Sequence, residues 1–188
     1  MRNIKQDAKR YCKKQRINVI DLIILYIRHF SFRIILQIRL YHYIKNNKSL
    51  LIKGIRPFLL LIIKIISKYS QRTTGILISL DQEISGGLKF EHYGGIVINC
   101  RHIGKHCTIF QNVTIGYAGR PGKGGSPTIG DNVVIGAGAV IVGPIKIGNN
   151  VFIGANACIF NDIPDNAVVG AAPGNIISFK GTKGYFGN

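Results

Sequence analysis

The sequence is poor in acidic residues, and the few it has are unevenly distributed. Among 188 residues there are 25 Lys and Arg but only eight Asp and Glu, which gives a formal net charge of +17. Residues 1–72 contain 17 of the basic residues and two acids, whereas residues 73–188 contain eight basic and six acidic residues. The excess charge therefore belongs to the N-terminal region, where it favours nucleic acid or an anionic membrane surface as a partner.

Several features that define other classes of protein are missing. There is no helix-turn-helix, aromatic platform or glycine-rich RNA motif, so we expect no nucleic-acid partner despite the charge. No signal peptide is apparent. The cysteines lack pairing or metal-ligand spacing, which predicts free thiols in a reducing cytoplasm. They are Cys12, Cys100, Cys107 and Cys158. No apolar run reaches the roughly 18 uncharged residues that a membrane-spanning helix needs.

The N-terminal region, residues 1–72, is nevertheless apolar between its cations. Residues 1–16 predict a short helix, and the apolar spacing in 17–46 and near 58–63 predicts a pair of helices, the second capped by Ser49. Two interpretations stay open. The helices pack on each other and on the rest of the protein, or they make peripheral contact with the inner face of the plasma membrane, where each cation contributes ~1 kcal/mol.

Within residues 84–170 an aliphatic residue returns at every sixth position. Helices need apolar spacing of three and four, and ordinary strands alternate every second residue, so this period fits neither. It indicates a parallel β-helix of hexapeptide repeats, with one short strand and one turn per repeat. The column consists of Ile103, Ile109, Ile115, Ile129, Ile135, Ile141, Ile147, Ile153 and Ile159.

The repeat is interrupted at two places. Ile103 follows Ile96 by seven residues, just after His92, and such a slip predicts a bulge of the kind found near sites. Residues 116–128 contain five glycines and two prolines, which predicts a loop outside the β-helix. We expect a β-helix domain over residues 73–178 and a short tail over 179–188.

The β-helix segment resembles the hexapeptide-repeat acetyltransferases, within them the serine O-acetyltransferase-like branch and the small enzymes of capsule and exopolysaccharide synthesis. The resemblance covers about 100 residues and rests on FEHYGGIVI from Phe90, QNVTIG from Gln111, IGAGA from Ile135, IGA from Ile153 and VGAAP from Val169. It implies a left-handed parallel β-helix, acetyl-CoA as co-substrate, and a homotrimer with its sites between neighbouring subunits.

The resemblance also implies roles for single residues. His92 matches the general base, and an imidazole suits removal of a hydroxyl proton near neutral pH; the alternative is a turn histidine that only bonds to backbone. No acid of this sequence aligns with the family's orienting acid, and Glu91, Glu83 or Asp81 could orient His92 instead. The candidate acetyl-CoA residues are Gly116 at the thioester, Ala137 and Ala155 along the pantetheine channel, and Arg120, Lys123 and Lys180 at the CoA phosphates, for which solvated surface charge is the alternative.

His102 and His106 are the other histidines of this segment. With His92 they formally supply the three histidines that a catalytic zinc site needs. Their spacing does not match the zinc-dependent hexapeptide enzymes, and they lie on polar positions of adjacent repeats. We therefore predict surface histidines and no metal.

Two departures separate the sequence from serine acetyltransferases. The place of their orienting acid, fifteen residues before the histidine, is taken by Leu77, and Gly125-Ser126 replaces their serine-binding Arg-His pair. Lost charged hydrogen bonds, each ~1.5–3 kcal/mol, would weaken the binding of free serine. We therefore predict an acetyl-CoA-dependent O-acetyltransferase acting on a hydroxyl of a sugar or cell-envelope glycan intermediate. The alternatives are a serine O-acetyltransferase and a non-catalytic, membrane-associated hexapeptide scaffold.

Overall fold

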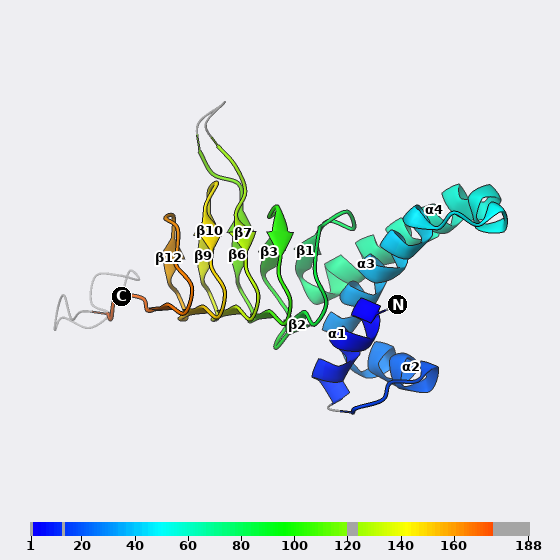
Figure 1. Ribbon diagram of the computed structural model, residues 1–188, viewed down its shortest axis with the longest axis horizontal. Coiled ribbons are helices and arrows are strands. Elements are labelled where there is room, and N and C mark those ends of the chain that lie inside the picture. Colours follow the sequence, from blue (N-terminus) through cyan, green and yellow to red (C-terminus); the bar gives the residue numbers. More distant parts are fainter. Residues whose placement is uncertain (1, 13, 120–123, 175–188) are drawn as a thin grey trace, which may run out of the picture.

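The computed structural model describes residues 2–12, 14–119 and 124–174, in which helices are followed by a parallel β-helix (Figure 1). The predicted tail over 179–188 lies outside these residues. The helices are α1 (Arg2–Cys12), α2 (Val19–Arg28), α3 (Phe30–Asn46) and α4 (Leu50–Thr74). None of the described helices is long and apolar enough to span a membrane.

The β-helix is built from short strands that pair only in parallel. Three sheets form its sides, with strand orders β1-β3-β6-β9-β12, β10-β7-β4 and β13-β11-β8-β5-β2, here called sheets A, B and C. A left-handed parallel β-helix with an N-terminal helical extension is therefore confirmed. The strands are β1 (Ile76–Ile78), β2 (Lys89–Phe90), β3 (Ile96–Ile98), β4 (His102–Ile103), β5 (Thr108–Ile109), β6 (Thr114–Gly116), β7 (Thr128–Ile129), β8 (Val134–Ile135), β9 (Val140–Val142), β10 (Lys146–Ile147), β11 (Phe152–Ile153), β12 (Cys158–Ile159) and β13 (Val168–Val169).

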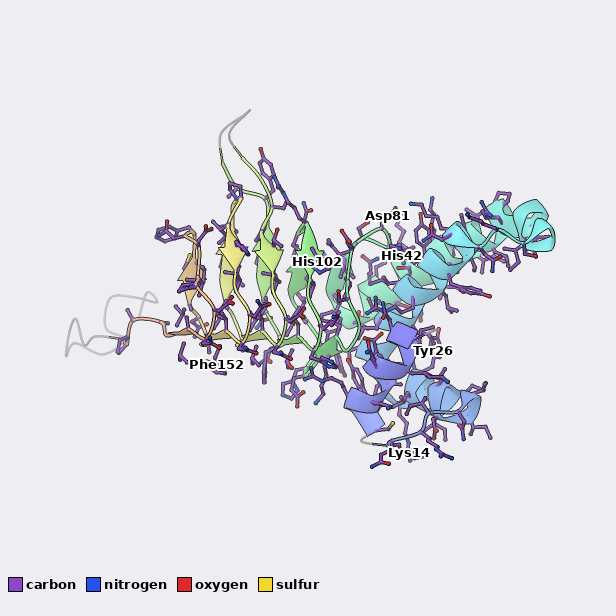
Figure 2. The ribbon with its side chains drawn as sticks, in the orientation of Figure 1. Lys14, Tyr26, His42, Asp81, His102 and Phe152 are labelled. Atoms are coloured by element: carbon purple, nitrogen blue, oxygen red, sulfur yellow. The ribbon has the colours of Figure 1, made fainter. Side chains whose placement is uncertain are left out.

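The hexapeptide column fills the interior, as its period requires. Its isoleucines are 0–5% exposed, whereas Phe152, on the neighbouring outward position, is 47% exposed and lies on the outer surface (Figure 2). Asparagines stand at several corners with positive φ, for example 56° at Asn132 and 55° at Asn150. Asparagine tolerates this backbone region better than most residues. The Asn132 side chain also donates to Asn150 Oδ1 at 3.1 Å, which links successive coils.

The first irregularity lies at His92 itself, and it differs in detail from the prediction. Phe90 is in register with Ile109, and Ile98, not Ile96, is in register with Ile115. The column therefore runs from Phe90 to Ile98 across eight residues, with the extra length in the turn that contains His92. Spacing along the sequence assigns Ile96 to the column, because it lies six residues after Phe90. Ile96 and Ile98 are both buried, so only the strand pairing shows that Ile98 occupies the column position.

The second irregularity is the predicted loop between sheets A and B. Strand partners on either side of it are 26 residues apart, as in Thr114 and Val140, instead of the 18 that separate Val140 from Cys158. The segment leaves the β-helix as an arm after β6 (Figure 1). Ala118 and Gly125 pair at its base through two backbone hydrogen bonds of 3.1 and 3.0 Å. Residues 120–123 lie outside the described part.

The helical region differs from the predicted pair of helices, because the stretch 17–46 is divided at His29. This residue ends α2 and begins α3 with an extended backbone, φ −114° and ψ 99°. No proline or glycine marks the break. The Arg33 side chain instead binds the final carbonyls of α2, with 2.7 Å to Tyr26 O and 3.0 Å to Ile27 O. A side chain that caps a helix end from the next helix is a tertiary feature that apolar spacing does not indicate.

Helices α1 and α3 pack directly on the first coil. Ile34, Ile35 and Ile38 belong to the same apolar core as the β-helix column. The buried Asp7 carboxylate binds the Arg39 guanidinium and accepts from the Gly87 and Leu88 amides at 2.7 and 3.0 Å. Part of the basic charge therefore joins the helices to the β-helix, while α4 projects away from it (Figure 1).

Candidate active site

His92 lies in the enlarged turn between β2 and β3, at the corner where sheet C meets sheet A. The turn closes through Gly94 and Gly95, whose φ values are 108° and 64°. At Gly95 a side chain is also excluded sterically, since a Cβ would stand 2.2 Å from Asn112 Oδ1. The His92 side chain is exposed, and its ring centroid is 6.1 Å from that of Phe110. The local sequence thus presents an accessible imidazole at a corner of the β-helix.

A groove of about 620 Å³ separates this turn from the helices. Its helical wall comes from the α2–α3 junction, residues 28–31, and from Tyr11 of α1, and its other wall is the segment 89–93. Two ring pairs border it: Phe30 and Tyr93 at 5.7 Å, and Tyr11 and His29 at 5.4 Å. Periodicity along the chain does not indicate this wall, because the junction is 61–64 residues away from His92 in the sequence.

Tyr11 holds the start of the His92 turn in place. Its hydroxyl accepts from the Phe90 amide at 2.9 Å and donates to the Phe90 carbonyl at 3.4 Å. Burial raises the pKa of the phenol to about 12, because the phenolate would lose its hydration. At neutral pH Tyr11 is therefore a hydrogen-bonding group and not a proton carrier.

The three acids considered as partners of His92 bind other groups. Glu91 pairs with Lys89, and Glu83 Oε1 is 3.8 Å from His102 Nδ1. Asp81 binds Lys45 and Tyr41 of α3, where the first coil meets the helices (Figure 2). Among the described residues no carboxylate forms a hydrogen bond or ion pair with the His92 ring.

The candidate acetyl-CoA residues fall at two different corners. Ala137 and Ala155 lie at the corner between sheets C and A, as His92 does, and they stack in successive coils with a 2.8 Å bond from Asn156 N to Ala137 O. Gly116 ends β6 at the other edge of sheet A, where the loop begins. Arg120, Lys123 and Lys180 lie outside the described residues. A single chain therefore does not bring Gly116 together with His92.

The remaining histidines occupy separate positions. His102 lies on β4 of sheet B, with Nε2 3.4 Å from Ser85 Oγ. His106 has φ 57°, and its carbonyl accepts from Arg10. Within the described ranges there is no group of three or more His, Cys, Asp or Glu residues arranged to hold a metal ion.

Comparison with known proteins relates this geometry to characterised relatives. Residues 126–161 match the family model for the bacterial transferase hexapeptide (six repeats). The chain is 36% identical over 121 residues to a serine acetyltransferase of Synechococcus elongatus, which covers 64% of this chain and 50% of that protein. The chain thus spans about half the length of the curated relatives it matches.

Solved structures extend the likeness to the helical region. Serine acetyltransferase isoform 3 of Entamoeba histolytica, in complex with cysteine, matches with a TM-score of 0.68 at 29% identity, over 94% of this chain and 60% of that one. A serine acetyltransferase in complex with CoA matches with a TM-score of 0.63 at 27% identity, over 93% of this chain and 67% of that one. The predicted resemblance to the serine O-acetyltransferase-like branch is therefore confirmed: this is a hexapeptide-repeat chain similar in sequence and fold to the serine acetyltransferases. The resemblance to capsule and exopolysaccharide enzymes stays a prediction.

Proposed function

We propose that the protein is an acetyl-CoA-dependent O-acetyltransferase in which His92 is the general base. The observation that carries the proposal is the exposed imidazole at the same corner as the small residues Ala137 and Ala155, in a fold shared with serine acetyltransferases. A positioned imidazole removes the hydroxyl proton as the oxygen attacks the thioester carbonyl, and the CoA thiolate leaves with a proton. The CoA complex of one structural neighbour supports the choice of co-substrate.

Free serine is the acceptor that the comparisons favour, and the sugar or glycan hydroxyl predicted from the sequence is the second candidate. The curated relative and both structural neighbours described above are named serine acetyltransferases. The sugar is kept because of one specific observation, the Gly125-Ser126 pair at the base of the loop. These residues supply neither the cation nor the imidazole of the serine-binding pair.

A homotrimer would complete the site. His92 and Gly116 lie at opposite edges of sheet A within one chain, so the loop of a neighbouring subunit is the segment that would meet the His92 corner. Light scattering should give three times the chain mass of 20.7 kDa. A monomer that is active at all concentrations would contradict this arrangement.

The activity is tested by measuring thiol release from acetyl-CoA with L-serine and with a panel of sugars. His92→Gln should reduce the rate by roughly 10²- to 10⁴-fold, the usual contribution of a general base. His102→Gln, on another side of the β-helix, is the matched control and should stay near the original rate. Turnover that persists in His92→Gln would reject the assignment, and failure to bind CoA in calorimetry would favour the non-catalytic scaffold.

Peripheral contact with an anionic membrane is proposed for the helical region. Side chains of α2 and α4 form exposed apolar surfaces, among them Ile23 at 54%, Phe58 at 65% and Leu61 at 55% exposure. Residues 1–72 carry 17 cations and two acids, which complements anionic lipids.

The full chain should sediment with vesicles that contain phosphatidylserine, and less so at high salt. A Phe58→Ser, Leu61→Ser double variant should stay in solution; Phe160→Ser on the β-helix is the control. Equal vesicle binding by the full chain, the double variant and Phe160→Ser would refute the membrane contact.

A further inference from the structure

The groove between the α2–α3 junction and the His92 turn has the dimensions of a ligand site. Its volume of about 620 Å³ lies within the range of roughly 300–1,000 Å³ that small-molecule pockets occupy. Its walls come from segments distant in sequence, and the Phe30–Tyr93 contact holds the junction against the turn at 5.7 Å. His92 lines it, so a molecule in the groove lies beside the proposed general base.

The charges that line the groove do not balance. Lys89 and Glu91 form an ion pair with each other, which offsets both. Arg28, the last residue of α2, has an exposed side chain with no hydrogen-bond or ion-pair partner in the described part of the chain. Arg33, five residues later, is by contrast held by the Tyr26 and Ile27 carbonyls. The groove is therefore lined by one guanidinium without a counter-charge, on the helical wall that faces the His92 turn.

We propose that this groove binds the acceptor and that Arg28 binds a carboxylate or phosphate group that the acceptor carries near its reacting hydroxyl. The inference rests on the proposed acetyl transfer and narrows its substrate class to anionic hydroxy compounds. A guanidinium recognises both anions through paired N–H donors, whereas a neutral sugar offers it no counter-charge. Recognition would then come from the helix junction and not from the loop, where Gly125-Ser126 offers no charge.

The two acceptor candidates, serine and an acidic sugar, share the chemical feature that this assignment requires: an anionic group close to a hydroxyl. Free serine presents a carboxylate two bonds from its hydroxyl-bearing carbon, and acidic sugars present a carboxylate or phosphate beside several hydroxyls. The groove excludes neutral sugars as preferred acceptors but not charged ones. Serine, glucuronic acid and glucose 1-phosphate are therefore the probes that distinguish the sources of the anion, and glucose is the neutral comparison.

The test compares the full chain with Arg28→Gln and Arg28→Lys, and with Arg101→Gln as a charge-matched control. Arg101 is also an exposed arginine, but its Nη2 lies near Gly125 at the base of the loop, 3.5 Å from where a Gly125 Cβ would stand. For the anionic acceptor that is used, KM should rise roughly 10- to 100-fold in Arg28→Gln, the loss expected for a charged hydrogen bond. kcat should change much less, Arg28→Lys should recover part of the affinity, and Arg101→Gln should match the original protein.

A direct binding measurement distinguishes a wrong assignment of the acceptor groove from a wrong assignment of the acetyltransferase activity. Each probe is titrated by NMR without acetyl-CoA, with thermal unfolding as a check that the variants are folded. If the anions bind only when Arg28 is present but no acetyl transfer occurs, the groove assignment stands and the proposed activity is rejected. If acetyl transfer occurs but its KM is unchanged in Arg28→Gln, or is lower for glucose than for every anion, the proposed activity stands and the groove assignment is rejected. Loss of affinity in Arg101→Gln alone would move the anion site to the loop, and neither binding nor transfer would overturn both proposals.

Discussion

At the scale of the residue, Asp7 shows how the few acids of the N-terminal region are used. Its side chain is fully buried, and Arg39 binds both of its oxygens. Asp7→Asn would leave the buried guanidinium without a counter-charge, so the free energy of unfolding should fall by about 3–5 kcal/mol. Urea denaturation measures this. Glu83→Gln, an exposed acid, should change stability by no more than about 0.5 kcal/mol, and equal effects of both would contradict the structure.

Tyr11 should make the free energy of unfolding depend on pH in the alkaline range. Its pKa in the folded protein is raised to about 12 by burial, whereas an unfolded tyrosine ionises near 10. Between these values the unfolded state loses the proton first, so the contribution of Tyr11 is intact below pH 10 and falls by about 2–3 kcal/mol as the pH rises to 12. Tyr11→Phe should show a shallower decline in stability over this interval. Parallel curves for the two proteins would mean that the phenol is not buried in solution.

At the scale of the element, the β-helix corners depend on residues that accept positive φ. Asn150 has φ 55°, whereas its neighbour Asn149 has no positive φ. Asn150→Ala should be less stable than Asn150→Gly by about 1 kcal/mol, because alanine is strained in the left-handed region. At Asn149 the order should reverse, with alanine the more stable. Thermal unfolding of the four variants measures the difference, and the same order at both positions would contradict the corner geometry.

At the scale of the whole molecule, the helices and the β-helix should unfold together. Ile35 of α3 is 1% exposed and lies in the same core as the β-helix column. Ile35→Ala should cost about 2–5 kcal/mol, while exposed Ile23→Ala should be nearly neutral. Circular dichroism and tyrosine fluorescence should report one coincident transition for the original protein and for Ile35→Ala. Two separate transitions would show that the helices are an independent unit.

Most of the fold follows from the sequence, because a period of six leaves few alternatives. Each isoleucine of the column needs an interior position, and only a coil with three short sides repeats at that spacing. The loop was also predictable, since five glycines in thirteen residues cannot continue the column. The slip at His92 was placed only approximately, because Ile96 lies six residues after Phe90 and so fits the period, whereas strand pairing puts Ile98 in the column.

The sequence alone determined the β-helix, its loop and His92 as the candidate base, because these depend on local spacing and motif. Tertiary structure alone decided what surrounds that base. It placed Gly116 at a different corner, left His92 without a carboxylate partner among the described residues, and brought the α2–α3 junction with Arg28 across from it. The reason is physical: the break at His29 is held by Arg33 and by ring packing on Tyr11, contacts between segments that no periodicity along the chain records.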